Sequence, residues 1–166
     1  GTVLTSYKNV GAIPNPNYAD NIFQVSESFF NSDFWYRNEF EVAKDFAKEK
    51  VFLNFDGLNW KADIYLNGEK IGRQEGAFIR GTYDVTNRLV EGKNVLAVKI
   101  EKNAHIGAVK EKYEYNTDFN GGILGADNPT FHATIGWDWI STIRGRNIGI
   151  YNDVYLTTSG KVTLHD

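Results

Sequence analysis

Hydrophobic and polar residues alternate along much of this chain with the period of two that is typical of half-buried β-strands. In residues 34–42, Phe34 and Tyr36 fall on one face and Trp35 on the other, more polar face. The same alternation returns in residues 51–55, 62–66, 78–83, 131–135 and 150–156. Residues 95–100 are apolar at five of six positions, which predicts a strand in the middle of a sandwich.

Turn signals separate these segments. Asn67-Gly68 predicts a tight β-hairpin, because both central residues of a type I′ turn need positive φ. Asp56-Gly57 indicates a break between two strands. About eight or nine short strands without a strong amphipathic helix predict an all-β fold, an antiparallel β-sandwich. We favour a jelly roll, with an immunoglobulin sandwich as the alternative.

The pattern also suggests how the chain is divided. Residues 1–28 are rich in turn formers, and we expect an extended lead-in that packs on the domain and begins with a short strand; a plain linker is the alternative. Residues 29–160 form the sandwich, and residues 161–166 begin a linker. The longest stretch without a period is 101–129, which we expect to lie beside the tryptophan-rich loop described below.

Composition narrows the class of protein. A chain of 166 residues with 42% hydrophobic and 14% aromatic residues is long enough for one sizeable core. A net charge of −3 gives no support to nucleic-acid binding, and no apolar run reaches membrane-spanning length. There is no cysteine, and the chain starts at Gly1 without any methionine, so we expect a processed or excised piece. The compartment stays open, with a periplasmic or extracellular location preferred.

The alternation stops in the loop that contains Trp137, Asp138 and Trp139, followed by Arg144 and Arg146. Aromatic faces stack on the C–H patches of sugar rings, and charged side chains form hydrogen bonds with hydroxyl groups. We therefore predict one wall of a sugar site, with Trp137 as the indole that faces the sugar. Alternatively, the Asp138 carboxylate caps the backbone amides of a turn, and the two arginines form an interface with a further domain.

Several spaced motifs resemble the N-terminal sugar-binding domain of the glycoside hydrolases related to β-galactosidase, β-glucuronidase, β-mannosidase and exo-β-glucosaminidase. The resemblance covers residues 29–156. The matching residues are Phe55 to Asn59, Ala62 to Gly68, Gly72, Tyr83 to Thr86, Leu89, Gly92 to Asn94 and Gly149 to Val154.

The resemblance implies a jelly roll of the galactose-binding type, followed by an immunoglobulin-like domain and a catalytic (β/α)8 barrel. Both catalytic glutamates would lie on the barrel, so no residue of this chain is predicted to be catalytic. The string Gly136 to Trp139 is similar to one in the mannosidase-like branch, which implies that Asp138 accepts hydrogen bonds from sugar hydroxyls. Asn59 matches a position that reaches the sugar in the galactosidase branch. Ile140 departs from the mannosidase pattern, so the sequence does not decide which sugar is bound.

The sequence therefore predicts the non-catalytic sugar-binding domain of a retaining exo-glycosidase that hydrolyses β-linked glycosides. Its predicted partners are a carbohydrate substrate and the other domains of the parent chain, with no nucleic acid and no membrane. We predict no cofactor and no metal, because the spacing of His105, Asp127 and His132 matches no ligand motif. The alternatives are an autonomous carbohydrate-binding module and a structural interaction sandwich. Sugar binding by the isolated domain would favour the module, and loop mutations that alter only folding would favour the structural sandwich.

Overall fold

The computed structural model describes residues 1–44, 46, 50–109, 122–126 and 143–160, and the account below concerns these residues. Two compact units are formed: Gly1–Phe34 with Glu101–Gly149, and Trp35–Ile100 with the chain from Ile150 onward. The first segment of the chain packs with a segment about a hundred residues later, and the predicted boundaries at residues 29 and 161 stay predictions. We call the two units the helical unit and the sandwich unit.

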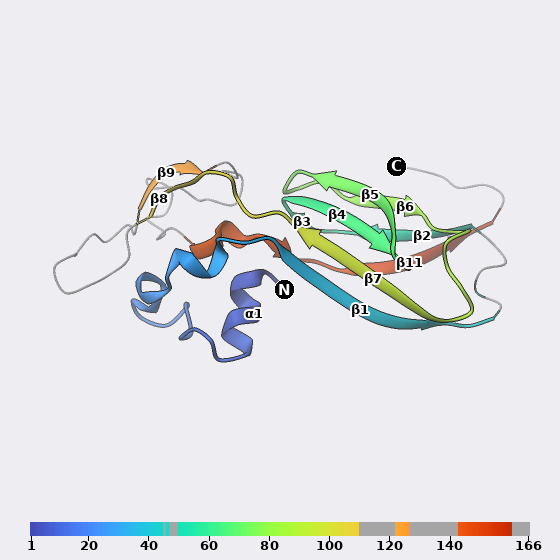
Figure 1. Cartoon of the computed structure of the whole chain (residues 1–166), viewed down its shortest axis with the longest axis horizontal. Helices are drawn as coiled ribbons and strands as arrows, with labels where there is room; N and C mark the ends of the chain where they lie inside the picture. Colours follow the sequence, from blue (N-terminus) through green and yellow to red (C-terminus); the bar gives the residue numbers. More distant parts are fainter. Residues whose placement is uncertain (45, 47–49, 110–121, 127–142, 161–166) are drawn as a thin grey trace. The chain divides into compact units, whose positions relative to one another are not determined.

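The sandwich unit contains two antiparallel sheets (Figure 1). A four-stranded sheet has the order β1-β7-β4-β5, and a three-stranded sheet has the order β11-β2-β6. The bounds are Phe34–Val42 for β1, Lys50–Phe55 for β2, Lys61–Leu66 for β4, Glu69–Glu75 for β5, Gly81–Asp84 for β6, Gly92–Ile100 for β7 and Val154–Ser159 for β11. Short strands β3 (Leu58–Asn59) and β10 (Gly149–Ile150) complete this part of the chain. The prediction of an all-β antiparallel fold is confirmed.

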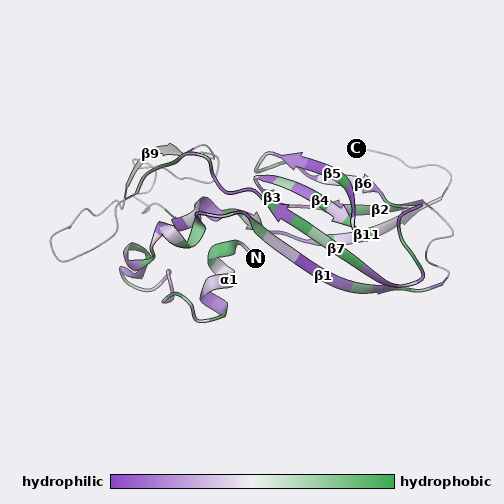
Figure 2. Ribbon diagram, viewed as in Figure 1, coloured by the Kyte–Doolittle hydropathy of each residue, from purple (hydrophilic) through white to green (hydrophobic). Residues whose placement is uncertain are grey.

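The core follows from the alternation in the strands. Phe55, Ile64 and Ile100 are fully buried, and each lies two residues from another buried residue on its strand. Figure 2 shows hydrophilic and hydrophobic residues alternating along β4. Side chains from both sheets line a cavity of about 390 Å³, with Leu53 on β2 and Val98 on β7 among them. β7 lies between β1 and β4, as its apolar sequence predicted.

The predicted hairpin is confirmed. Asn67 and Gly68 both have positive φ, 51° and 87°, and connect β4 to β5. The side chain of Asn67 also accepts a hydrogen bond from the Val95 amide at 2.9 Å and donates to the Asn94 side chain at 2.8 Å. The Asn94 amide group in turn donates to the Val90 carbonyl at 2.8 Å. These two asparagines therefore tie the hairpin to the turn that precedes β7.

The helical unit was not predicted. Residues Val3–Asn9 form helix α1, with Thr2 as its N-cap, and 3-10 helices follow at Asn21–Gln24 (η1) and Glu27–Phe30 (η2). The lead-in is therefore helical at residues 3–9 and in the two short 3-10 turns, where an extended segment was expected. Strands β8 (Ile106–Val109) and β9 (Gly122–Ala126) pair antiparallel within the stretch that showed no period. No helix in the described ranges has the length and hydrophobicity to cross a membrane.

Candidate functional site

The described part of the candidate site is the segment that follows the predicted tryptophan loop. Arg144–Asn147 forms the short 3-10 turn η5, in which Gly145, Arg146 and Asn147 all have positive φ. A Cβ atom added to Gly145 would lie 2.3 Å from the Phe30 ring, so glycine is needed for packing as well as for its φ of 66°. Phe30 in turn meets the ring of Tyr7 edge-on. The turn is therefore packed tightly against η2.

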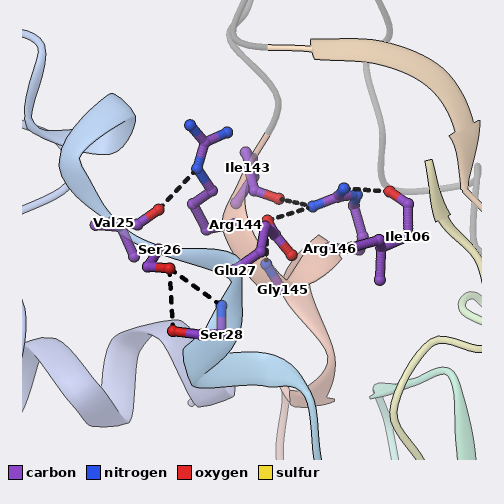
Figure 3. Close-up of polar contacts among 9 residues, drawn as sticks. All are labelled: Val25, Ser26, Glu27, Ser28, Ile106, Ile143, Arg144, Gly145 and Arg146. Atoms are coloured by element: carbon purple, nitrogen blue, oxygen red, sulfur yellow. Dashed lines mark hydrogen bonds and ion pairs between the residues drawn. The ribbon is translucent and has the colours of Figure 1, made fainter. Parts of the chain in front are cut away.

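Arg146 anchors this turn through its guanidinium group (Figure 3). Only 1% of the residue is exposed, and its Nη1 donates to Glu27 Oε1 at 2.7 Å and to the Ile143 carbonyl at 3.3 Å. Its Nη2 donates to the Ile106 carbonyl at the start of β8. One buried side chain thus connects η2, β8 and η5, which lie far apart in the sequence.

Arg144 also forms a hydrogen bond with the segment that leads into η2. It is fully buried, and its Nε donates to the Val25 carbonyl at 2.9 Å (Figure 3). The Gly145 amide donates to Glu27 Oε1 at 3.4 Å, so this carboxylate accepts from two residues of the turn. Ser26 caps η2 by accepting from the Ser28 amide at 3.3 Å, which fixes the backbone that carries Glu27.

The structure therefore brings Arg144 and Arg146 together with a residue that sequence reasoning missed, Glu27. A signal was present, because Ser26 followed by Glu27 is a helix N-cap with an acidic first turn. No sequence pattern, however, links Glu27 to an arginine 119 positions later. Buried guanidinium groups bonded to backbone carbonyls and a carboxylate act first as positioning groups for the turn. Their contact with a sugar stays a prediction.

Asn59 lies in β3 of the sandwich unit and is fully buried. Its role as a sugar contact stays a prediction. Trp137, Asp138 and Trp139 lie outside the described residues, as do the predicted strand at 131–135 and the predicted linker at 161–166. The structure thus describes the residues that follow this segment in the sequence, and not the segment itself.

Among the described residues, the carboxyl groups with clearly lowered pKa values belong to the sandwich unit. Hydrogen bonds from Lys93 and then Arg37 lower the pKa of Glu39, and hydrogen bonds from the side chain and amide of Thr86 lower the pKa of Asp84. The pKa of Asp63 is lowered through a hydrogen bond from Lys70, with a further contribution from Arg73. These carboxylates are anions held by structural partners. In the ranges that the structure describes, no group of three His, Cys, Asp or Glu residues is arranged to hold a metal.

The fold and the motifs together define a galactose-binding-like β-sandwich domain with a basic turn that follows the Trp137-Asp138-Trp139 motif in the sequence. Residues 1–152 match the family described as glycosyl hydrolase 2 galactose-binding domain-like, and the chain belongs to this family. The immunoglobulin alternative is therefore wrong, because the matching family is of the galactose-binding type.

Curated relatives are enzymes several times longer than this chain. A mannosylglycoprotein endo-beta-mannosidase of Lilium longiflorum is 35% identical over 173 residues, covering 100% of this chain and 17% of the relative. An exo-beta-D-glucosaminidase of Streptomyces avermitilis is 31% identical, covering 99% and 16%. The chain thus spans about a sixth of the length of these relatives.

Solved structures agree with this assignment. The crystal structure of a beta-D-mannosidase from Dictyoglomus thermophilum superposes with a TM-score of 0.67 at 27% identity, covering 97% of this chain and 20% of that one. An exo-chitosanase from Amycolatopsis orientalis superposes with a TM-score of 0.68 at 25% identity, covering 96% and 16%. The chain therefore corresponds to the N-terminal, galactose-binding-like part of family 2 glycosidases.

Proposed function

We propose that this chain is the non-catalytic substrate-binding domain of a retaining exo-glycosidase that acts on β-linked glycosides. The observation that carries the proposal is the match to the galactose-binding-like domain family over residues 1–152, in a chain that spans about a sixth of its glycosidase relatives. The catalytic glutamates and a barrel that holds them would lie elsewhere in the parent protein, after an immunoglobulin-like domain.

In this proposal, Asp138 accepts hydrogen bonds from hydroxyl groups of the sugar, and Trp137 and Trp139 supply apolar surface, with Trp137 against the ring. Arg144 and Arg146 hold the backbone that leaves this loop, because both guanidinium groups are buried and bonded to other parts of the helical unit. A loop held in place before the substrate arrives loses little conformational entropy on binding, and this favours a precise contact.

The test is the full-length protein with Asp138→Ala, assayed on aryl β-glycosides of mannose, glucosamine, galactose and glucuronic acid. We expect kcat/KM on the preferred sugar to fall roughly 10- to 1000-fold, because contacts to transition-state hydroxyl groups are lost. Asp153→Ala is the matched control, since this aspartate is exposed and its hydrogen bonds within the described residues use its backbone, with the amide donating to Asn152 and the carbonyl accepting from the Asp56 amide, and it should leave kcat/KM unchanged. An unchanged kcat/KM for Asp138→Ala would remove this residue from the mechanism.

The mode of attack needs a separate measurement, because the printed names of the relatives include an endo-beta-mannosidase and exo-beta-D-glucosaminidases. Proton NMR of the first product should show retention of the β-anomer if a covalent intermediate forms. An oligosaccharide blocked at its non-reducing end should resist hydrolysis if the enzyme is exo-acting. Rapid cleavage of the blocked chain would show an endo-acting enzyme.

A further inference from the structure

The outer face of the four-stranded sheet carries an aromatic pair. Trp35 on β1 and Tyr65 on β4 have ring centroids 5.5 Å apart and an interplanar angle of 42°. Trp35 is 58% exposed, although it belongs to a regular strand. Its neighbours along the strand, Phe34 and Tyr36, are less exposed, so the indole lies on the face that points away from the core.

The two rings come from strands that are not adjacent. β7 runs between β1 and β4, and its residue opposite Tyr65 is Ala97. Ala97 carries only a methyl group beside Tyr65, and the rings of Trp35 and Tyr65 meet across β7. Within the described part of the chain, neither the indole N–H of Trp35 nor the hydroxyl of Tyr65 forms a hydrogen bond. The sheet therefore presents an aromatic platform, made of Trp35, Ala97 and Tyr65, with polar groups still available at its edges.

Charged groups around this platform are largely paired with one another. Asp63, two residues from Tyr65 on the same face, forms ion pairs with Lys70 at 2.7 Å and Arg73 at 3.0 Å. On β1, Glu39 pairs with Arg37 and with Lys93 of β7. Both signs of charge occur on this face and form ion pairs there, so it favours neither a polyanion nor a polycation. A neutral ligand with both apolar and hydroxyl surface complements it best.

We propose that this platform is a second carbohydrate-binding surface, which takes the pyranose rings of a neutral β-linked oligosaccharide chain. The C–H face of a sugar ring stacks on an exposed aromatic ring, and the tilt between the two rings suits two successive residues of a twisted chain. Ala97 matters in this proposal, because a larger side chain opposite Tyr65 would compete with a sugar ring for the surface beside it. The choice of sugar polymers as ligands rests on the proposed function. The evidence for the platform itself comes from the sheet and does not depend on that function.

The test is retardation of the full-length protein in native gels that contain soluble β-1,4-glucomannan, run in the cold. We expect Trp35→Ala and Tyr65→Ala each to weaken the apparent Kd by at least about fivefold, because each removes one stacking surface. Trp35→Phe keeps an aromatic face and should retain most of the binding. Ala97→Leu should weaken binding as strongly as Trp35→Ala, although it removes no aromatic group.

Tyr18→Ala is the matched control, since Tyr18 is an aromatic residue of the helical unit with 69% exposure. It should bind glucomannan like the wild type, and all variants should keep the wild-type melting temperature and kcat/KM on an aryl β-glycoside. Equal retardation of Trp35→Ala and wild type would overturn the proposal. Protection of Trp35 from fluorescence quenching by acrylamide would also overturn it, because it would show that a protein domain covers the platform. If the protein hydrolyses no glycoside, the proposed function fails, and retardation still tests the platform.

Discussion

Arg146 carries its charge into the interior of the helical unit, where 1% of the residue is exposed. A buried guanidinium group is stable only with partners that compensate for the loss of water, and Glu27 with the Ile143 and Ile106 carbonyls supplies them. The same contacts make Arg146 an anchor of η5, and its contact with a sugar stays a prediction. Removal of one partner would leave a buried charge uncompensated.

Glu27→Gln should therefore lower the free energy of unfolding by about 3 kcal/mol, because the neutral amide no longer balances Arg146. Urea denaturation followed by tryptophan fluorescence measures the change. Glu39→Gln is the matched control: this carboxylate also pairs with two cations, but on the surface, and its loss should have no measurable effect. The double variant Glu27→Leu with Arg146→Met should be more stable than Glu27→Gln. A change below about 1 kcal/mol for Glu27→Gln would contradict the anchoring role.

The β4–β5 hairpin shows how one element combines local and cross-strand interactions. Its turn depends on Asn67 and Gly68, whereas its strands are held by direct pairing of residues such as Asp63 and Arg73. Opposite charges on facing positions favour this register, because a slip of one residue would place Asp63 on the core side of the sheet. The hairpin is thus specified twice, by its turn and by its charges.

This pairing makes a pH-dependent contribution to stability. The hydrogen bond from Lys70, and then that from Arg73, lowers the pKa of Asp63, so the folded state binds a proton less readily than the unfolded chain. The contribution is fully present above the unfolded pKa of about 3.9 and is lost as the pH falls through the lower folded pKa. Asp63→Asn should reduce the loss of stability between about pH 5 and pH 3, measured by thermal melts across this range. An unchanged pH profile in Asp63→Asn would show that the ion pairs contribute nothing.

The chain as a whole passes repeatedly between its two compact units, since each unit is built from segments that are not contiguous. The first thirty-odd residues supply several partners of η5 and its C-cap Ile148: the Val25 carbonyl, the Glu27 carboxylate and the amide of Val3, which donates to the Ile148 carbonyl at 2.9 Å. The lead-in is thus an integral part of the helical unit.

Deletion of residues 1–28 should consequently destabilise residues 143–149 and leave the two sheets of the sandwich unit folded. Hydrogen exchange read by mass spectrometry should show lost protection in peptides that contain η5, and wild-type protection in peptides from β2 and β4. Protection unchanged in η5 would mean that the lead-in is the plain linker considered from the sequence. Loss of protection in both units would show that they fold as one.

Sequence by itself determined the strands near 34–42, 51–55, 62–66 and 95–100, the Asn67-Gly68 turn and the family, because period-two alternation and turn residues are local and several family motifs lie in or beside these strands. The strand predicted at 150–156 is interrupted instead, since β10 ends at Ile150 and β11 begins at Val154. Only the tertiary structure decided that residues 3–9 are helical, that Glu27 balances Arg146, and that Trp35 meets Tyr65 across β7. Each of these depends on segments far apart in the chain. A short helix gains most of its stability from packing, and the partner of a buried charge is set by the path of the backbone in space.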